Sequence, residues 1–254
     1  MRLRLIRHAT LIIEYHGHRI LLDPMLDEAG ARPAIEHSPN ARTNPLVALP
    51  EPASEVLKGV DAVLVTHTHS DHWDATASKL TAKQMPLFGQ VEDEAKFRAA
   101  GFTAVQSIRN EANWNGIQIT RTGGHHGTGE IAKKLAPVSG FVLRAAGEPT
   151  LYVAGDTIWC SEVDEAIESF NPNVVVLNAG AARFLEGNPI TMTAEDVIRV
   201  CQAATNAQVV AVHMEAINHC LLTRADLAFQ LEAARVIGQV AIPGDGDWVQ
   251  PWRN

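Results

Sequence analysis

The hydrophobic pattern at the start of the chain predicts antiparallel strands joined by a tight turn. Apolar residues alternate through Leu3 and Leu5 and continue through residues 11–15, and His16-Gly17-His18 follows as a hairpin turn. Residues 19–22 then form a returning strand, which ends at Asp23-Pro24 because proline cannot continue a strand ladder. The chain is therefore expected to begin with a β-hairpin.

The pattern changes twice after this hairpin. Residues 28–54 contain five prolines and few periodic apolar positions, which predicts a long surface loop, either a functional lid or a mobile insertion. Strands then alternate with helices, without a linker or a low-complexity tract, so one mixed α/β domain over residues 1–254 is expected. The expected strands are 60–66, 86–88, 117–121, 140–144, 150–154, 174–177 and 209–212, and the expected helices are 75–83, 91–100, 161–169, 194–205 and 224–237.

Composition and charge restrict the partners. Apolar residues make up 46% and charged residues 20% of the 254 residues, which is typical of a globular protein. The net charge of −8 argues against a nucleic-acid backbone as a partner, although bound cations could still attract a small anion. No signal-peptide core or membrane span is expected, and Cys160, Cys201 and Cys220 lack C-x-x-C spacing, so we expect reduced thiols in the cytoplasm.

The strongest chemical signal is the segment Thr66-His67-Thr68-His69-Ser70-Asp71-His72, at the end of an expected buried strand. Three imidazoles and one carboxylate so close together would be costly to bury unless they bound something, and these donors suit zinc, manganese or iron. His67 and His69 project the same way from extended backbone, while Asp71 and His72 come from the following turn and can face a second cation.

This segment resembles the H-x-H-x-D-H signature of the metallo-β-lactamase superfamily, and the later strand ends offer the further ligands of that family. The resemblance implies the four-layer αββα sandwich called the metallo-β-lactamase fold, with mixed sheets and a metal site at the strand ends. It is greatest for the branch of metal-dependent hydrolases related to ascorbate-6-phosphate lactonases. By the same resemblance, one metal is bound by His67, His69 and His126, the second by Asp71, His72 and His213, and both by Asp156.

Two of these assignments involve a choice between neighbouring histidines. His126 is preferred to His125, because the ligand in similar sequences tends to precede a small residue directly. His213 is preferred to His219, because His213 follows its strand immediately and His219 lies six residues farther along a loop. His219 is expected to face the substrate or to support a ligand. In related sequences an aspartate at the position of Asp23 tends to support a metal histidine, and a turn aspartate is the alternative.

The resemblance implies a hydrolase that uses a metal-bridged hydroxide to cleave a small ester, lactone or phosphodiester. Asp71 is expected to orient the nucleophile and, with His219, to form the catalytic pair beside two divalent ions, most simply zinc or manganese, with iron as a further candidate. A di-iron redox protein on the same fold and a nuclease are the rival functions. The expected partner is a small-molecule substrate, and a homodimer is the default oligomer.

Overall fold

Two β-sheets of seven strands each form the centre of the molecule in the computed structural model, which describes residues 1–250. In spatial order, the first sheet contains β14 (Trp248–Val249), β1 (Arg2–Arg7), β2 (Thr10–Tyr15), β3 (His18–Leu22), β4 (Ala62–Val65), β5 (Leu87–Gln90) and β6 (Val105–Ile108). The second contains β13 (Val240–Ala241), β12 (Gln208–Val212), β11 (Val174–Asn178), β10 (Leu151–Val153), β9 (Gly140–Arg144), β8 (Ile117–Thr122) and β7 (Glu111–Trp114). Both sheets combine parallel and antiparallel pairs.

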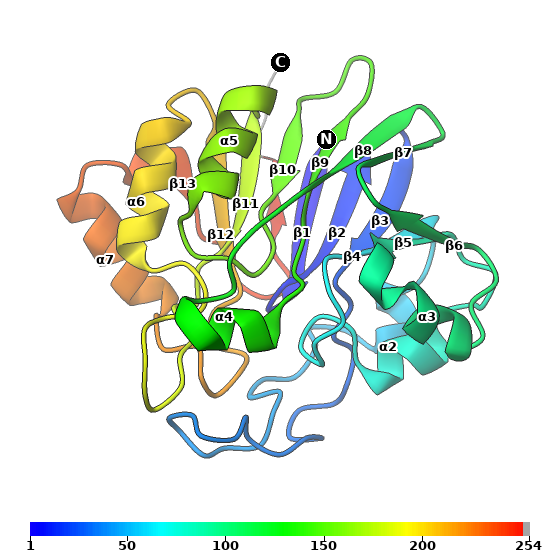
Figure 1. The fold of residues 1–254 in the computed structure, drawn as a ribbon, viewed down its shortest axis with the longest axis horizontal. Helices are drawn as coiled ribbons and strands as arrows, with labels where there is room; N and C mark the ends of the chain where they lie inside the picture. Colours follow the sequence, from blue (N-terminus) through cyan, green and yellow to red (C-terminus); the bar gives the residue numbers. More distant parts are fainter. Residues whose placement is uncertain (251–254) are drawn as a thin grey trace.

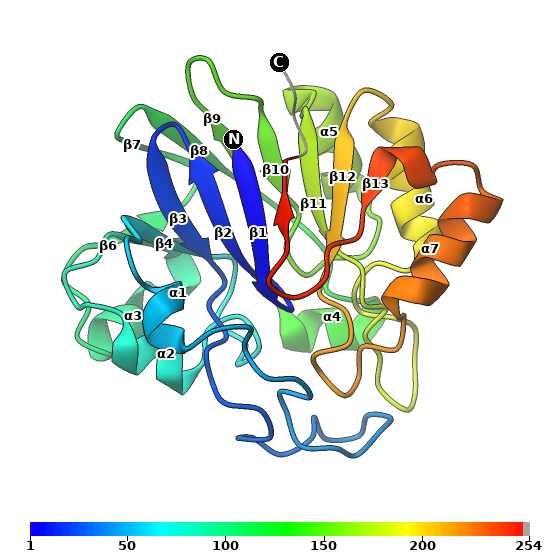
Figure 2. The same ribbon diagram turned by 180° about the vertical axis from the view of Figure 1, so that it is seen from behind.

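Helices cover the outer face of each sheet, as Figures 1 and 2 show from opposite sides. The first sheet carries α1 (Ala53–Val56), α2 (Ala75–Leu80), the 3-10 turn η1 (Val91–Asp93) and α3 (Glu94–Ala99). The second carries α5 (Ser161–Phe170), α6 (Ala194–Ala203), α7 (Arg224–Ala233) and the 3-10 turn η2 (Ile237–Gln239). The remaining helix, α4 (Gly129–Leu135), lies at the lower edge of Figure 1. The expected αββα sandwich is confirmed.

The central strands β4, β10 and β11 are buried on both faces, which explains their continuous apolar runs. Leu64 of β4 points inward and packs with Val176 of β11 in the layer between the sheets. The alternate residues Val63 and Val65 point outward and pack with Phe97 of α3. A third apolar layer lies between the second sheet and helices α5, α6 and α7. The sandwich therefore has three apolar layers between four layers of secondary structure.

The polar residues expected at strand ends all lie at one edge of this sandwich. Strands β1, β3 and β4 are parallel in the first sheet, and β8, β10 and β12 are parallel in the second, so their carboxyl ends meet at the lower edge of Figure 1. The backbone N–H of His213, directly after β12, donates to the carbonyl of His8, directly after β1, at 2.8 Å. This bond joins the two sheets at the edge where the site forms.

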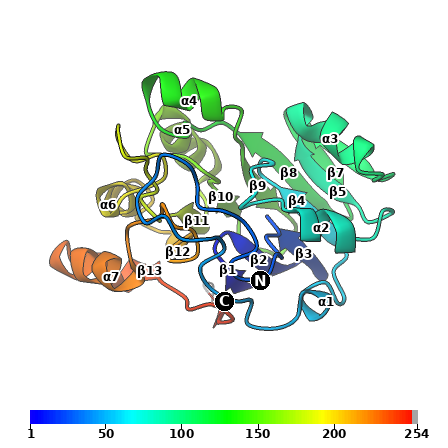
Figure 3. The same cartoon turned by 90° about the horizontal axis from the view of Figure 1, so that it is seen from below.

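The long loop between β3 and α1 lies across this edge, as the view from below shows (Figure 3). The amide of Asn218 holds it there: Asn218 Oδ1 accepts from the backbone N–H of Ile35 at 3.0 Å and from the side chain of Asn44 at 2.7 Å. The buried guanidinium of Arg7 donates to the carbonyls of Met25, Asp27 and Val47 at 2.8–2.9 Å. The loop is thus an ordered cover with its own polar supports.

Several elements differ from the sequence prediction. Strands β6, β7, β13 and β14 and helix α4 were not expected, because they are short or lie at exposed sheet edges, and α4 has no buried residue. The expected helix over residues 224–237 is too long: α7 ends at Ala233, and Arg235 adopts a left-handed conformation with φ of 60°. Among residues 1–250, no helix has the length and apolar composition that crossing a membrane requires.

Candidate metal centre

Three histidines converge on one side of the buried carboxylate of Asp156. His67 and His69 come from the loop after β4, and His126 comes from the loop after β8. One ring nitrogen of each lies within 4.8 Å of those of the other two, and His67 Nε2 lies 2.9 Å from His69 Nδ1. His126 Nε2 is 3.4 Å and His67 Nε2 is 3.9 Å from Asp156 Oδ2. These three imidazoles and the carboxylate form a first group of donors.

A second group of donors contacts the same carboxylate. His72 Nε2 is 3.3 Å from Asp156 Oδ2, and His213 Nε2 is 3.3 Å from Asp156 Oδ1. The two imidazole nitrogens are themselves 3.3 Å apart. Asp71 Oδ2 completes this group at 3.7 Å from His213 Nε2 and 3.9 Å from His72 Nε2. The seven residues predicted as ligands therefore meet at one place, with Asp156 between the two groups.

The electrostatics of the cluster favour bound positive charge. Burial raises the pKa of the Asp156 carboxyl, but the surrounding imidazoles of His213, His72 and His126 lower it well below its ordinary value. Burial lowers the pKa of His72, whereas three neighbouring carboxylates raise it well above the usual range. The three carboxylates therefore favour positive charge at this place, and a divalent metal can supply that charge.

The cluster also has the outer hydrogen bonds that fix metal-binding imidazoles. Asp23 Oδ2 lies 2.8 Å from His72 Nδ1, and the carbonyl of Ile190 lies 2.8 Å from His126 Nδ1. If both Nδ1 atoms donate, the Nε2 lone pairs face the centre of the cluster. The Sγ of Cys220 lies 3.6 Å from His213 Nδ1 in the same way. The donor set, its burial and these outer contacts fit the binding of divalent metal.

Glycine allows the chain to reach this geometry at two positions. Gly155, before Asp156, has φ of +70°, and a Cβ there would lie 2.4 Å from the carbonyl oxygen of Ser139. A Cβ on Gly180 would lie 2.2 Å from the carbonyl oxygen of His213. Any larger residue would therefore displace backbone that carries a proposed ligand.

His8 belongs to the cluster, although the sequence analysis did not select it. Its Nε2 lies 3.2 Å from Asp71 Oδ2, and its ring lies against the ring of His213, with 3.6 Å between centroids. It is fully buried and groups with Asp71, His72 and His213 as a possible metal donor. One signal could have found it: like His213, it directly follows a strand.

His125 and His219, the alternatives to His126 and His213 as metal ligands, lie in different surroundings. His125 points away from the cluster and forms an ion pair with Glu162, with 2.9 Å between Nε2 and Oε1. His219 is buried, yet it groups with no metal donors among residues 1–250. Its Nδ1 has no hydrogen-bond partner there, and burial lowers its pKa to about 4. His219 is therefore a neutral imidazole beside the cluster.

A cavity of about 220 Å³ opens onto the cluster. Its lining combines polar residues of the cluster and His219 with four apolar side chains. The lining consists of Ile35, His69, Ser70, Asp71, His126, Leu135, Phe184, Ile190 and His219. In the described part of the chain, no lysine or arginine lines this cavity. Arg32 borders the adjoining cavity but is paired with Asp27, at 3.1 Å, and donates to the carbonyl of Ser70, at 2.5 Å.

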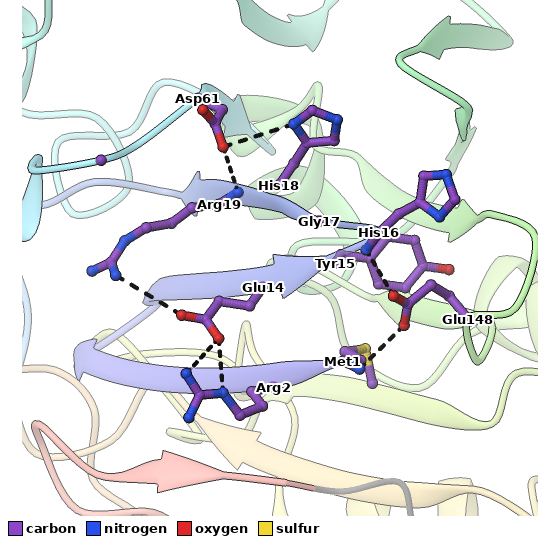
Figure 4. Close-up of a pocket in the computed structure, with 11 residues that line it drawn as sticks. Met1, Arg2, Glu14, Tyr15, His16, Gly17, His18, Arg19, Asp61 and Glu148 are labelled. Atoms are coloured by element: carbon purple, nitrogen blue, oxygen red, sulfur yellow. Dashed lines mark hydrogen bonds and ion pairs between the residues drawn. The ribbon is translucent and has the colours of Figure 1, made fainter. Parts of the chain in front are cut away.

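A larger cavity, of about 480 Å³, lies at the opposite end of the first sheet, around the β2–β3 hairpin. Its charged groups pair with each other, as Figure 4 shows. Arg2 contacts Glu14, His18 contacts Asp61, and the amino group of Met1 contacts Glu148. Because these charges are compensated in pairs and lie far from the strand-end cluster, this cavity is not the candidate active site.

Comparison with known proteins gives consistent similarities. A family model described as a beta-lactamase superfamily domain matches residues 18–214. The UPF0173 protein YddR of Bacillus subtilis is 36% identical over 250 residues, which cover 97% of this chain and 98% of that protein. Further relatives at lower coverage are named UPF0173 metal-dependent hydrolases.

Two solved structures are similar over nearly the whole chain. An isothiocyanate hydrolase from Delia radicum gut bacteria is 38% identical, with a TM-score of 0.93 and 98% of both chains covered. A possible metal-dependent hydrolase from Veillonella parvula is 34% identical, with a TM-score of 0.95 and the same coverage.

Proposed function

This chain belongs to the metallo-β-lactamase superfamily and is a metal-dependent hydrolase, and we propose that it cleaves a small, uncharged and largely apolar electrophile. Its fold is the metallo-β-lactamase fold expected from the sequence. The observation that carries the proposal is the cavity over the strand-end cluster, which combines the polar residues of the cluster with four apolar side chains and whose described lining contains no lysine or arginine.

The proposed metal centre follows the two groups of donors. His67, His69 and His126 would hold one cation and Asp71, His72 and His213 the other, and Asp156, which lies 3.3–3.9 Å from imidazole nitrogens of both groups, would be shared between them. Imidazole and carboxylate donors suit zinc or manganese, and iron is a further candidate. Such cations would supply a water-derived nucleophile at neutral pH and polarise the electrophile.

The side chains that face the cavity have complementary roles in this scheme. Asp71 is ionised, because neighbouring imidazoles lower its pKa well below the ordinary value although burial raises it. It can therefore accept a hydrogen bond from the attacking water and orient it. His219 is neutral, because burial lowers its pKa to about 4, and it lines the cavity, so its imidazole can donate a hydrogen bond to the leaving atom.

An isothiocyanate fits this cavity better than an anionic substrate. The similar protein from Delia radicum gut bacteria is named an isothiocyanate hydrolase, and an R–N=C=S group is small and uncharged. In its hydrolysis, water oxygen bonds to the central carbon, the carbon–nitrogen bond breaks, and nitrogen takes both water protons. The products are an amine and carbonyl sulfide, and no atom is oxidised or reduced. Apolar R groups would contact Ile35, Phe184 and Ile190.

Parallel assays on the metal-loaded protein test the proposal. We expect amine release from an aryl or alkyl isothiocyanate, slower cleavage of matched esters and lactones, and still slower cleavage of a phosphodiester, because the described lining offers no lysine or arginine to bind the phosphate oxygens beside the metal ions. Chelation and Asp71→Ala should each abolish the activity. Phe184→Arg tests the cavity, since it should favour an anionic ester over a neutral one. Equal turnover of phosphodiester and isothiocyanate would refute the substrate assignment, and chelator-resistant activity would refute the metal centre.

A further inference from the structure

A second cluster of metal-type donors lies outside the proposed metal centre. It combines the imidazole of His125, the thiol of Cys160 and the carboxylate of Glu162, and one donor atom of each lies within 4.8 Å of the others. His125 Nε2 is 2.9 Å from Glu162 Oε1, and Thr157 Oγ1 is 3.5 Å from Cys160 Sγ. The cluster is partly exposed, with 53% of the His125 side chain and 33% of that of Glu162 accessible to solvent.

The three donors come from two loops that also carry proposed ligands. His125 precedes His126 in the loop after β8, while Cys160 and Glu162 lie at the start of α5, just beyond Asp156. Backbone bonds already join these loops: the N–H of His125 donates to Thr157 Oγ1, and the N–H of Ile158 donates to the carbonyl of His125, both at 2.9 Å. The donors are therefore held near each other by bonds in which their own side chains take no part.

The close approach of the two loops depends on glycine. A Cβ on Gly123 would lie 3.1 Å from Glu162 Cγ, and a Cβ on Gly124 would lie 3.0 Å from Thr157 Cβ. A side chain at either position would force Glu162 or Thr157 to shift by a few tenths of an ångström. The glycines thus permit the close contact of the two segments that carry the imidazole, the thiol and the carboxylate.

We propose that His125, Cys160 and Glu162 form an auxiliary site for a thiophilic divalent cation such as zinc, with water at the remaining position. Thiolate, imidazole and carboxylate are the donors that zinc takes in proteins, commonly three of them with one open position. Binding displaces the thiol proton to solvent and forms the metal–sulfur bond, with no change of oxidation state. The cation cross-links the loop of His126 to the loop of Asp156, and so stabilises the strand-end cluster from outside.

Cobalt(II) tests the site, because a cobalt–thiolate bond gives a near-ultraviolet charge-transfer band that imidazole and carboxylate ligands do not give. Metal-free protein is titrated with Co²⁺, and bound cobalt is counted by elemental analysis. We expect the band in the wild type and its loss in Cys160→Ser, which should also bind one cobalt fewer. Cys220→Ser is the matched control, since Cys220 lies near His213 in the main cluster. It should keep the band.

Two further variants test the other donors. His125→Ala and Glu162→Gln should each weaken the cobalt affinity, measured from the band, by about 10-fold or more. Removing only an outer partner of a metal ligand already lowers metal affinity about 10- to 100-fold, and these two residues are proposed as direct ligands. Circular dichroism of each variant shows that it is folded. No band in the wild type, or a band that persists in Cys160→Ser and disappears in Cys220→Ser, would overturn the proposal. Neither result depends on turnover of any substrate.

Discussion

Replacing Asp23 with asparagine should weaken metal binding without altering any proposed ligand. Asp23 Oδ1 accepts from the backbone N–H of Thr66, and Oδ2 accepts from Thr66 Oγ1, both at 2.7 Å. The same Oδ2 lies 2.8 Å from His72 Nδ1. An asparagine has one acceptor oxygen, so its NH₂ group faces either the Thr66 N–H or the two groups at Oδ2, which are Thr66 Oγ1 and His72 Nδ1. In both orientations the negative charge beside His72 is lost.

The size of the effect follows from this geometry. Loss of an outer partner of a metal-binding imidazole commonly lowers metal affinity about 10- to 100-fold, which corresponds to about 1.4–2.7 kcal/mol. Asp23 is 1% exposed, so water cannot replace the missing acceptor. Asp23→Asn is therefore expected within this range, with Asp23→Ala at or beyond its upper end. The measurement is a zinc titration in competition with a chromophoric chelator.

Asp74→Asn provides the matched control. Asp74 is also buried and accepts two backbone N–H groups, those of Ala77 and Asp27, at 2.7 Å each. It forms no hydrogen bond or ion pair with an imidazole in residues 1–250, so its replacement should lower folding stability and leave zinc affinity unchanged. Unaltered zinc affinity in Asp23→Asn, or an equal loss in both variants, would show that the Asp23–His72 contact does not support the metal centre.

Three further predictions concern residues around the cluster. His8→Phe keeps a ring against His213 but removes the contact to Asp71, and we expect about a 10-fold or greater loss of zinc affinity, measured by the same titration; unchanged affinity would exclude His8 from the centre. Asn218→Ala removes the side-chain bonds of Asn218 to the covering loop, so steady-state kinetics should show KM rising more than kcat falls, and an unchanged KM would contradict the role of the loop. The pKa of His219 falls from 6.5 to about 4 in the folded state, so the folded state binds fewer protons and its stability decreases as pH falls from about 6.5 to 4. Denaturant titrations should show that the free energy of unfolding falls by up to about 3 kcal/mol more in the wild type than in His219→Gln over this pH range. The same pH dependence in both proteins would refute the prediction.

The strand-end histidines could be predicted from the sequence because their signal is local. A buried apolar strand followed directly by His67 or His213 places the imidazole at a sheet edge, and parallel strands bring such edges together. The H-x-H-x-D-H spacing then identifies the chemistry. For Asp23, the structure favours the supporting role over the simple turn, since its carboxylate contacts His72.

Other features depend on contacts that no local pattern encodes. The bond between Asn44 and Asn218 spans 174 positions, so the sequence predicted a loop but not what holds it. His8 was missed because it stands alone in the sequence, and its partner Asp71 is 63 positions away. Strands β13 and β14, of two residues each, form only because longer strands beside them offer free edges.

The most direct test of the account is the anomalous diffraction of crystals grown with zinc or manganese, recorded at the absorption edge of the metal. The proposed centre predicts two peaks on either side of the Asp156 carboxylate. One should lie among His67, His69 and His126, and the other among Asp71, His72 and His213. A single peak, or peaks only at other residues, would contradict the binuclear centre.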